Sequence, residues 1–132
     1  MIHNVRFKAV LDTNVIHPVI TRDLLFWLAY YDLYTPKWSN NIFDEWRSAM
    51  ERKGVPPEEV EKRVQKANIA FPDALVQNYD ALVPVLQLPD PKDCHVLAPA
   101  IKTNADLIVT NNIKDFPEEY IRFIRFESKN RG

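Results

Sequence analysis

Two acidic residues follow apolar segments that have the length of buried strands. Asp12 comes directly after the run FKAVL (7–11), and Asp115 lies a few residues after the run LIVT (107–110). Short apolar runs of this kind are typical of strands buried on both faces of a sheet. In open parallel sheets, ligands bind beyond the carboxyl ends of the strands, which is where both carboxylates are expected.

Two further acidic residues fall on the apolar faces of predicted helices. Glu45 lies between Ile42 and Trp46, inside a stripe that a helix following Ser39 would bury. Asp93 heads a second stripe, which continues with Val96, Leu97, Ala100 and Ile101. Each position also has an ordinary explanation. A glutamate stem can pack while its head reaches water, an acid in the first turn favours the helix dipole, and a carboxylate after a strand can cap the next turn.

Taken together, the four carboxylates indicate a cation site. Four like charges at one end of a sheet would repel strongly in a poorly solvated cleft, so a cation must offset them. Ligands that are all oxygen select a hard ion, Mg²⁺ or Mn²⁺. His95 has no second ligand-type partner nearby in the sequence, which argues against zinc.

The segments between these residues alternate between strands and helices. Strands are predicted at 7–11, 33–35, 82–86, 107–110 and 123–126. Helices are predicted at 21–33, 39–52, 56–70, 72–79 and 90–103, with a helical turn at 117–120. Ser39 is the expected N-cap of its helix, and Gly54 the expected end. This alternation predicts a three-layer α/β/α fold with a mostly parallel central sheet of four or five strands, formed by a single domain over residues 1–132.

Composition excludes several classes of protein. The 132 residues are 46% hydrophobic and 27% charged, which is the range of a globular domain with a core. Two glycines exclude a Gly-rich phosphate loop, and one cysteine, Cys94, excludes an internal disulfide. The 17 basic and 18 acidic residues exclude a wholly basic surface, so a nucleic acid would need a local patch or a metal. With no membrane-length apolar run and no signal peptide, we expect a cytoplasmic protein with no membrane contact.

Four blocks of the chain resemble those of the PIN domain, the small Mg²⁺-dependent nuclease fold of VapC-type toxins. VLDTNVI (10–16) is similar to the first block, and WSNNIFDEW (38–46) to the second. LPDPKDCHVLAPAI (88–101) resembles the third, and ADLIVTNNIKDFP (105–117) the fourth. The blocks follow the family order over nearly the whole chain. Their acids are the four identified above.

The resemblance implies an endoribonuclease that hydrolyses RNA phosphodiester bonds and leaves a 5′-phosphate. The residues that would be catalytic and would hold one or two Mg²⁺ or Mn²⁺ ions are Asp12, Glu45, Asp93 and Asp115. Those that would orient carboxylates or waters are Thr13, Asn14, Thr110 and Asn112. Two departures from the family pattern bear on the site. Pro99 is expected to bend the helix that carries Asp93, and Asn112 provides one charge less than an acid would.

Basic residues occur in two groups. Those on the predicted helices 39–52 and 56–70 are expected to be solvated, with pairs such as Glu59 with Arg63 and Glu58 with Lys62. The C-terminal tail has few balancing acids, so its basic residues are the better candidates for RNA phosphate contacts: Arg122, Arg125, Lys129 and Arg131.

An aromatic cluster marks the helix predicted at 21–33 and its exit. Its members are Phe26, Trp27, Tyr30, Tyr31 and Tyr34. They are too many for one buried stripe, so the helix either crosses a large core or forms an interface. Since PIN toxins form dimers and bind a small antitoxin, the resemblance implies a homodimer or an antitoxin groove here.

Two other functions are compatible with parts of the pattern. A receiver-like phosphoacceptor domain also has acids at strand ends, but it needs an adjacent acidic pair where this chain has Asp12, Thr13 and Asn14. A catalytically inactive PIN scaffold that binds RNA or protein would not need all four acids, which are present.

Overall fold

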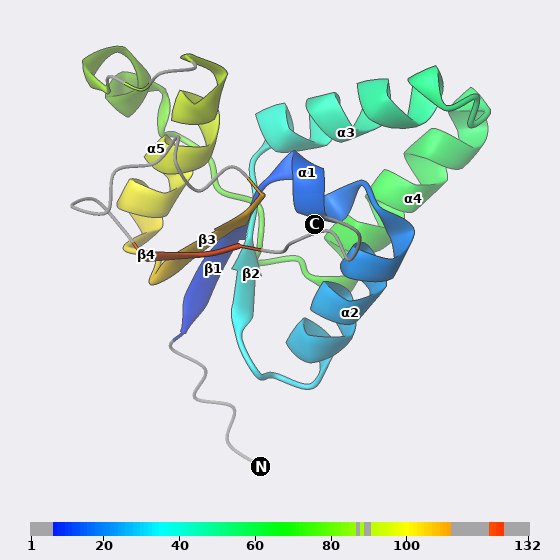
Figure 1. Ribbon diagram of the computed structural model, residues 1–132, viewed down its shortest axis with the longest axis horizontal. Helices are drawn as coiled ribbons and strands as arrows, with labels where there is room; N and C mark the ends of the chain where they lie inside the picture. Colours follow the sequence, from blue (N-terminus) through cyan, green and yellow to red (C-terminus); the bar gives the residue numbers. More distant parts are fainter. Residues whose placement is uncertain (1–6, 87, 89–90, 112–121, 126–132) are drawn as a thin grey trace, which may run out of the picture.

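A parallel sheet of four strands forms the centre of the structure (Figure 1). The computed structural model describes residues 7–86, 88, 91–111 and 122–125. The strands are β1 (Lys8–Leu11), β2 (Thr35–Lys37), β3 (Leu107–Thr110) and β4 (Arg122–Arg125), in the order β2-β1-β3-β4. All three pairings are parallel, so the carboxyl ends of the strands meet at one edge. The predicted α/β fold with four or five strands is confirmed.

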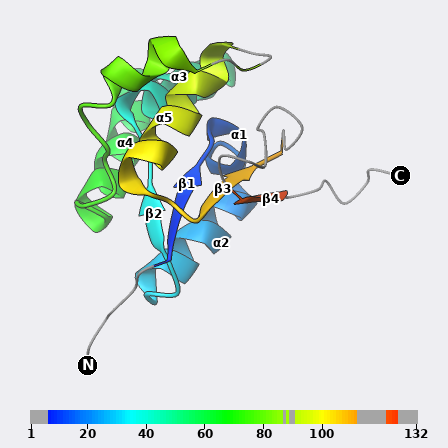
Figure 2. The same cartoon turned by 90° about the vertical axis from the view of Figure 1, so that its left-hand side faces the viewer.

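Helices cover both faces of this sheet. On one face α5 (Cys94–Thr103) contacts β1 and β3, and on the other lie α1 (Thr13–Ile16) and α2 (Val19–Tyr30). Figure 2 shows α5 in front of the strands and α2 behind them. The remaining helices are α3 (Asn40–Arg52), α4 (Pro57–Ala70) and the 3₁₀ helices η1 (Asp80–Val85) and η2 (Pro91–Asp93). In the part of the chain that the structure describes, no helix has the length and apolar character needed to span a membrane.

The predicted signals at the two ends of α3 are confirmed. The Ser39 side chain accepts a hydrogen bond from the Ile42 amide at 3.2 Å and so caps the first turn. Gly54, just beyond the helix, has a φ of +86°, a conformation that L side chains rarely adopt. The next helix begins with Pro57, followed by two glutamates in the first turn, as predicted. These local signals fix where α3 begins and ends, and they thereby fix the position of Glu45 along the helix.

Aromatic packing anchors α3 on the sheet. Trp38 and Phe43 are fully buried, with ring centroids 5.1 Å apart, and Trp46 packs on Phe43 at 5.6 Å. Together with Leu11 at the end of β1, these side chains belong to the main core. Burial of such large rings contributes a few kcal/mol each, which gives α3 a fixed position against the strand ends.

Several predicted boundaries are wrong. The helix expected from Thr21 begins at Val19, because Pro18 takes the N-cap position with an extended conformation. The strand expected at 33–35 lies at Thr35–Lys37 and contains Pro36, which an edge strand tolerates. No helix forms at 72–79, where Leu75 instead makes a parallel bridge to Trp38.

The segments before and after α5 also differ from the prediction. The strand expected at 82–86 is the 3₁₀ helix Asp80–Val85. The helix expected at 90–103 is divided into η2 and α5, so Asp93 lies at the junction and not one turn inside a helix. α5 continues through the buried Pro99 to Thr103. The last predicted strand lies at Arg122–Arg125, and the turn predicted at 117–120 falls outside the described residues.

Candidate active site

A cleft of about 850 Å³ lies beside the carboxyl end of β1. Its walls come from α1 with its two cap residues, from the length of α3 and from the junction of η2 with α5. Three of the four predicted acids, Asp12, Glu45 and Asp93, line it. Residues that are more than 30 positions apart in the sequence therefore share one solvent-filled space, at the position where parallel sheets bind ligands.

Asp12 is held by donors from two strands' ends. Its side chain is 6% exposed. One oxygen, Oδ1, accepts the Thr13 amide at 2.7 Å, and Oδ2 accepts the Thr110 hydroxyl at 2.9 Å. The Asn14 side-chain amide donates to Oδ2 at 3.3 Å. Three hydrogen bonds from separate donors fix the orientation of this carboxylate. Asp12 is also the N-cap of α1, so its structural role and its place in the cleft coincide.

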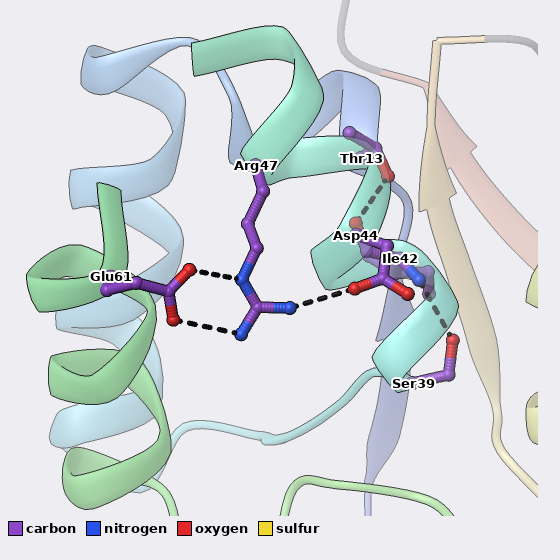
Figure 3. Close-up of polar contacts among 6 residues, drawn as sticks. All are labelled: Thr13, Ser39, Ile42, Asp44, Arg47 and Glu61. Carbon is purple, nitrogen blue, oxygen red and sulfur yellow. Dashed lines mark hydrogen bonds and ion pairs between the residues drawn. The ribbon is translucent and has the colours of Figure 1, made fainter. Parts of the chain in front are cut away.

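Glu45 is connected to the same loop through Thr13. The Thr13 hydroxyl lies 2.9 Å from Glu45 Oε1. It also lies 3.1 Å from the carbonyl oxygen of Ile42 (Figure 3). Glu45 is half-buried on α3 and has no basic partner among the residues that the structure describes. Thr13 thus contacts Asp12 through its amide and Glu45 through its hydroxyl, and it couples the positions of the two acids.

A second set of polar contacts links β1 to β3. Asn14 donates to the Thr110 hydroxyl at 3.3 Å, and its Oδ1 accepts the Asn111 amide at 3.1 Å. Thr110 is completely buried. Three of the residues predicted to orient carboxylates, Thr13, Asn14 and Thr110, are therefore in contact with Asp12 or Glu45. Asn112 and Asp115 lie outside the described residues.

A sequence model of the PIN domain matches residues 8–114. The chain belongs to the PIN domain family. Among solved structures, a chain of VapBC2 from Rickettsia felis, bound to a DNA fragment from their promoter, is similar with a TM-score of 0.64. The two are 20% identical, and the match covers 92% of this chain and 100% of that chain. No curated protein sequence matched significantly.

The acids of this PIN domain supply the donor type that a hard cation needs. Within residues 7–111, apart from the gaps at 87 and 89–90, no three acidic, histidine or cysteine side chains are grouped closely enough to hold an ion together. The cation site formed by all four carboxylates stays a prediction, because Asp115 lies outside the described residues. The carboxylates of Asp12, Glu45 and Asp93 offer only oxygen donors, which fits Mg²⁺ or Mn²⁺ bound partly through water.

Several residues that line the cleft were not predicted. Asn41, Ser48 and Arg52 lie at i−4, i+3 and i+7 from Glu45, so the helical spacing that identified Glu45 could have identified them. Asp44 also lines the cleft and accepts from Arg47 at 2.8 Å (Figure 3). His17 carries no sequence signal, because it becomes part of the cleft only through the short helix α1.

The basic side of the cleft changes the protonation of His17. Burial lowers the pKa of this imidazole below its ordinary value, and the positive charges of Lys53, Arg22 and Arg52 lower it further. His17 is therefore neutral at neutral pH. The cleft of this PIN domain therefore has two kinds of lining. Carboxylates line one part of it, and positive charges act on the part that contains His17.

Proposed function

We propose that this PIN domain is a Mg²⁺- or Mn²⁺-dependent endoribonuclease, and that it is the toxin of a toxin–antitoxin pair. Family membership supports a nuclease. The observation that carries the proposal is the shared cleft, which is lined by Asp12, Glu45 and Asp93 from three separate segments. Asp115 is proposed as the fourth acid, and Asn112 as a further orienting residue.

The proposed reaction is hydrolysis of one phosphodiester bond. Water adds to phosphorus and the P–O3′ bond breaks, which gives a 5′-phosphate and a 3′-hydroxyl. A divalent ion in the cleft would lower the pKa of the attacking water and neutralise charge on the phosphate. The chain's own contribution is positional. Thr13 and Thr110 hold the Asp12 carboxylate through hydrogen bonds, Thr13 also holds Glu45, and Asn14 links the two strand ends.

The test is cleavage of total RNA by the purified protein, with Mg²⁺ or Mn²⁺ and with chelator. We expect fragments with 5′-phosphate ends that appear only with the metal. Calorimetric titration with Mn²⁺ distinguishes the proposed nuclease from an inactive PIN scaffold, because the scaffold would bind no divalent ion. Labelling by acetyl phosphate would instead indicate the receiver-like phosphoacceptor, although the chain lacks the acidic pair that such a domain needs.

We also propose that α2 carries the partner surface. Three of its aromatic side chains are exposed, Trp27 by 56%, Tyr30 by 65% and Tyr31 by 64%, and their rings pack on one another. Exposed aromatic clusters are typical of protein interfaces. The other two predicted members, Phe26 and Tyr34, pack inward, so only part of the cluster is available.

The proposed partners are a second copy of the chain and a small antitoxin. The similar structure from Rickettsia felis is described as VapBC2, which supports an antitoxin for this chain. Light scattering at micromolar concentration is expected to show a dimer that the change Trp27→Glu converts to a monomer, while a wild-type monomer would contradict the homodimer. The proposed setting is the cytoplasm, where RNA is present and Cys94 stays reduced.

A further inference from the structure

The cleft contains a cation that is not neutralised by the protein. Arg52 is the last residue of α3, two turns from Glu45 on the same face, and both side chains line the cleft. Among the described residues, Arg52 makes neither an ion pair nor a side-chain hydrogen bond. An exposed guanidinium at the wall of an acid-lined cleft is free to bind an anion.

The other arginines near this region are already engaged. Arg47 binds Glu61 and Asp44, each at 2.8 Å (Figure 3), and Arg63 binds Glu59 at 3.1 Å. Arg22 donates to the carbonyl oxygens that end α1, those of Ile16 at 3.1 Å and His17 at 3.2 Å. Its guanidinium also lies 5.3 Å from the centre of the Trp46 ring. These contacts make Arg22 a structural residue, and among the described residues they leave Arg52 as the unpaired arginine that lines the cleft.

Positive charge converges on the part of the cleft formed by His17. The charges of Lys53, Arg22 and Arg52 all act on its imidazole, in addition to the effect of burial. An anion placed there would meet a positive field and a neutral imidazole that can donate one N–H. The cleft volume of about 850 Å³ is large enough for more than a single phosphate group.

We propose that Arg52, together with His17, binds a phosphate of the RNA strand next to the phosphate that is cleaved. This inference rests on the proposed function and names the residues that position its substrate. A guanidinium suits the role because it offers paired N–H donors that match phosphate oxygens. RNA bound at two points, by the carboxylate-held ion and by Arg52, would be fixed in direction along the cleft.

Arg52 also has a simpler role that the test must separate. A cation in the last turn favours the helix dipole of α3, so its removal could lower stability without any effect on RNA. The salt dependence of RNA binding by Arg52→Gln and Arg52→Lys distinguishes the two roles. Both roles are kept in part by lysine, whereas only the phosphate contact affects how binding depends on salt.

The experiment measures binding of a labelled single-stranded RNA by fluorescence anisotropy, over a series of salt concentrations. Ca²⁺ takes the place of Mg²⁺ in this assay and neutralises the negative charge of the cleft carboxylates. Arg52→Gln is expected to weaken binding about 10-fold and to reduce the slope of log K against log salt by about 0.7. Arg52→Lys is expected to be intermediate. Lys62→Gln, an equal charge change at an exposed position of α4 outside the cleft, is expected to bind as wild type does.

A second measurement keeps this inference separate from the nuclease proposal. Inorganic phosphate is titrated into the protein while NMR follows the His17 ring, and bound phosphate is expected to raise the pKa of His17 in wild type but not in Arg52→Gln. Equal binding by Arg52→Gln and Lys62→Gln in a protein that cuts RNA would overturn the Arg52 site alone. A phosphate response lost in Arg52→Gln, in a protein that cuts no RNA, would support the site and overturn the RNA substrate.

Discussion

The Ser39 hydroxyl lies 3.4 Å from the carbonyl oxygen of His95. In a regular helix that carbonyl would accept the amide of residue 99, but residue 99 is proline and has no amide hydrogen. Ser39 also accepts the Ile42 amide at the start of α3. One hydroxyl therefore caps the helix that carries Glu45 and contacts the helix that follows Asp93, which ties two walls of the cleft together.

Ser39→Ala is expected to lower the free energy of unfolding by about 1–2 kcal/mol, because Ser39 is a fully buried N-cap. In a Pro99→Ala background, the new amide at position 99 can satisfy the His95 carbonyl. The cost of Ser39→Ala should then be smaller, and chemical denaturation of the four proteins in this double-mutant cycle measures the difference. Additive effects would show that the contact between α3 and α5 contributes nothing.

Thr13→Val is expected to reduce RNA cleavage about 10- to 100-fold, because Glu45 and the Ile42 carbonyl lose their contact with the hydroxyl. Thr13→Ser keeps the hydroxyl and should retain most of the activity. The turnover rate with Mg²⁺ is the measurement, and circular dichroism checks that both variants are folded. Equal rates in the two variants would mean that the orientation of Glu45 does not limit the reaction.

Asp12→Asn and Asp93→Asn are each expected to fold and to lose at least about 100-fold in metal-dependent cleavage. Asparagine is as good an N-cap as aspartate, so the first substitution leaves α1 in place. Asp73→Asn, at an exposed position outside the cleft, removes the same charge and serves as the control. Full activity in either cleft variant would argue strongly against the proposed metal site.

Stability at alkaline pH is expected to depend on Tyr34. Its hydroxyl donates to the Leu25 carbonyl at 2.8 Å, and burial raises the pKa of this phenol above its ordinary value. The folded state therefore favours the neutral ring. The resulting stability is complete below the unfolded pKa of about 10 and is lost as the pH rises toward the folded value.

Urea denaturation between about pH 8 and pH 11 measures this effect. Tyr34→Phe should cost about 1 kcal/mol at neutral pH through the lost hydrogen bond, and its stability should fall less steeply above pH 10. A wild type and a Tyr34→Phe protein with parallel pH profiles would contradict the role of burial.

Local signals in the sequence predicted those elements whose ends depend on a few neighbouring residues. Ser39 and Gly54 bound α3, and Pro57 begins α4, because caps and φ preferences act within one turn. The segment 72–79 was predicted wrongly because its conformation depends on a distant residue. Trp38 donates to the Ala74 carbonyl at 3.0 Å and accepts the Val76 amide at 2.8 Å, and these bonds hold the segment extended.

The same distinction applies to the candidate site. Asp12, Glu45 and Asp93 could be predicted because a carboxylate beside apolar positions is unusual in each local pattern. His17 could not, because a histidine in a loop is ordinary until the fold brings it into the cleft, and Arg52 is marked in the sequence only by its helical spacing from Glu45. Residues from separate segments become neighbours only through tertiary packing, and the pattern within one segment does not reveal that packing.

Pro36 has a consequence for how the protein behaves at high concentration. It lies in the middle of β2, one of the two edge strands, where Thr35 directs its amide inward to the Phe7 carbonyl. The nitrogen of Pro36 consequently faces the open side and has no hydrogen to offer, and the next outward donor, Trp38, is occupied by Ala74. A foreign strand would find no continuous ladder there, so this rim is protected against the growth of intermolecular β-aggregates.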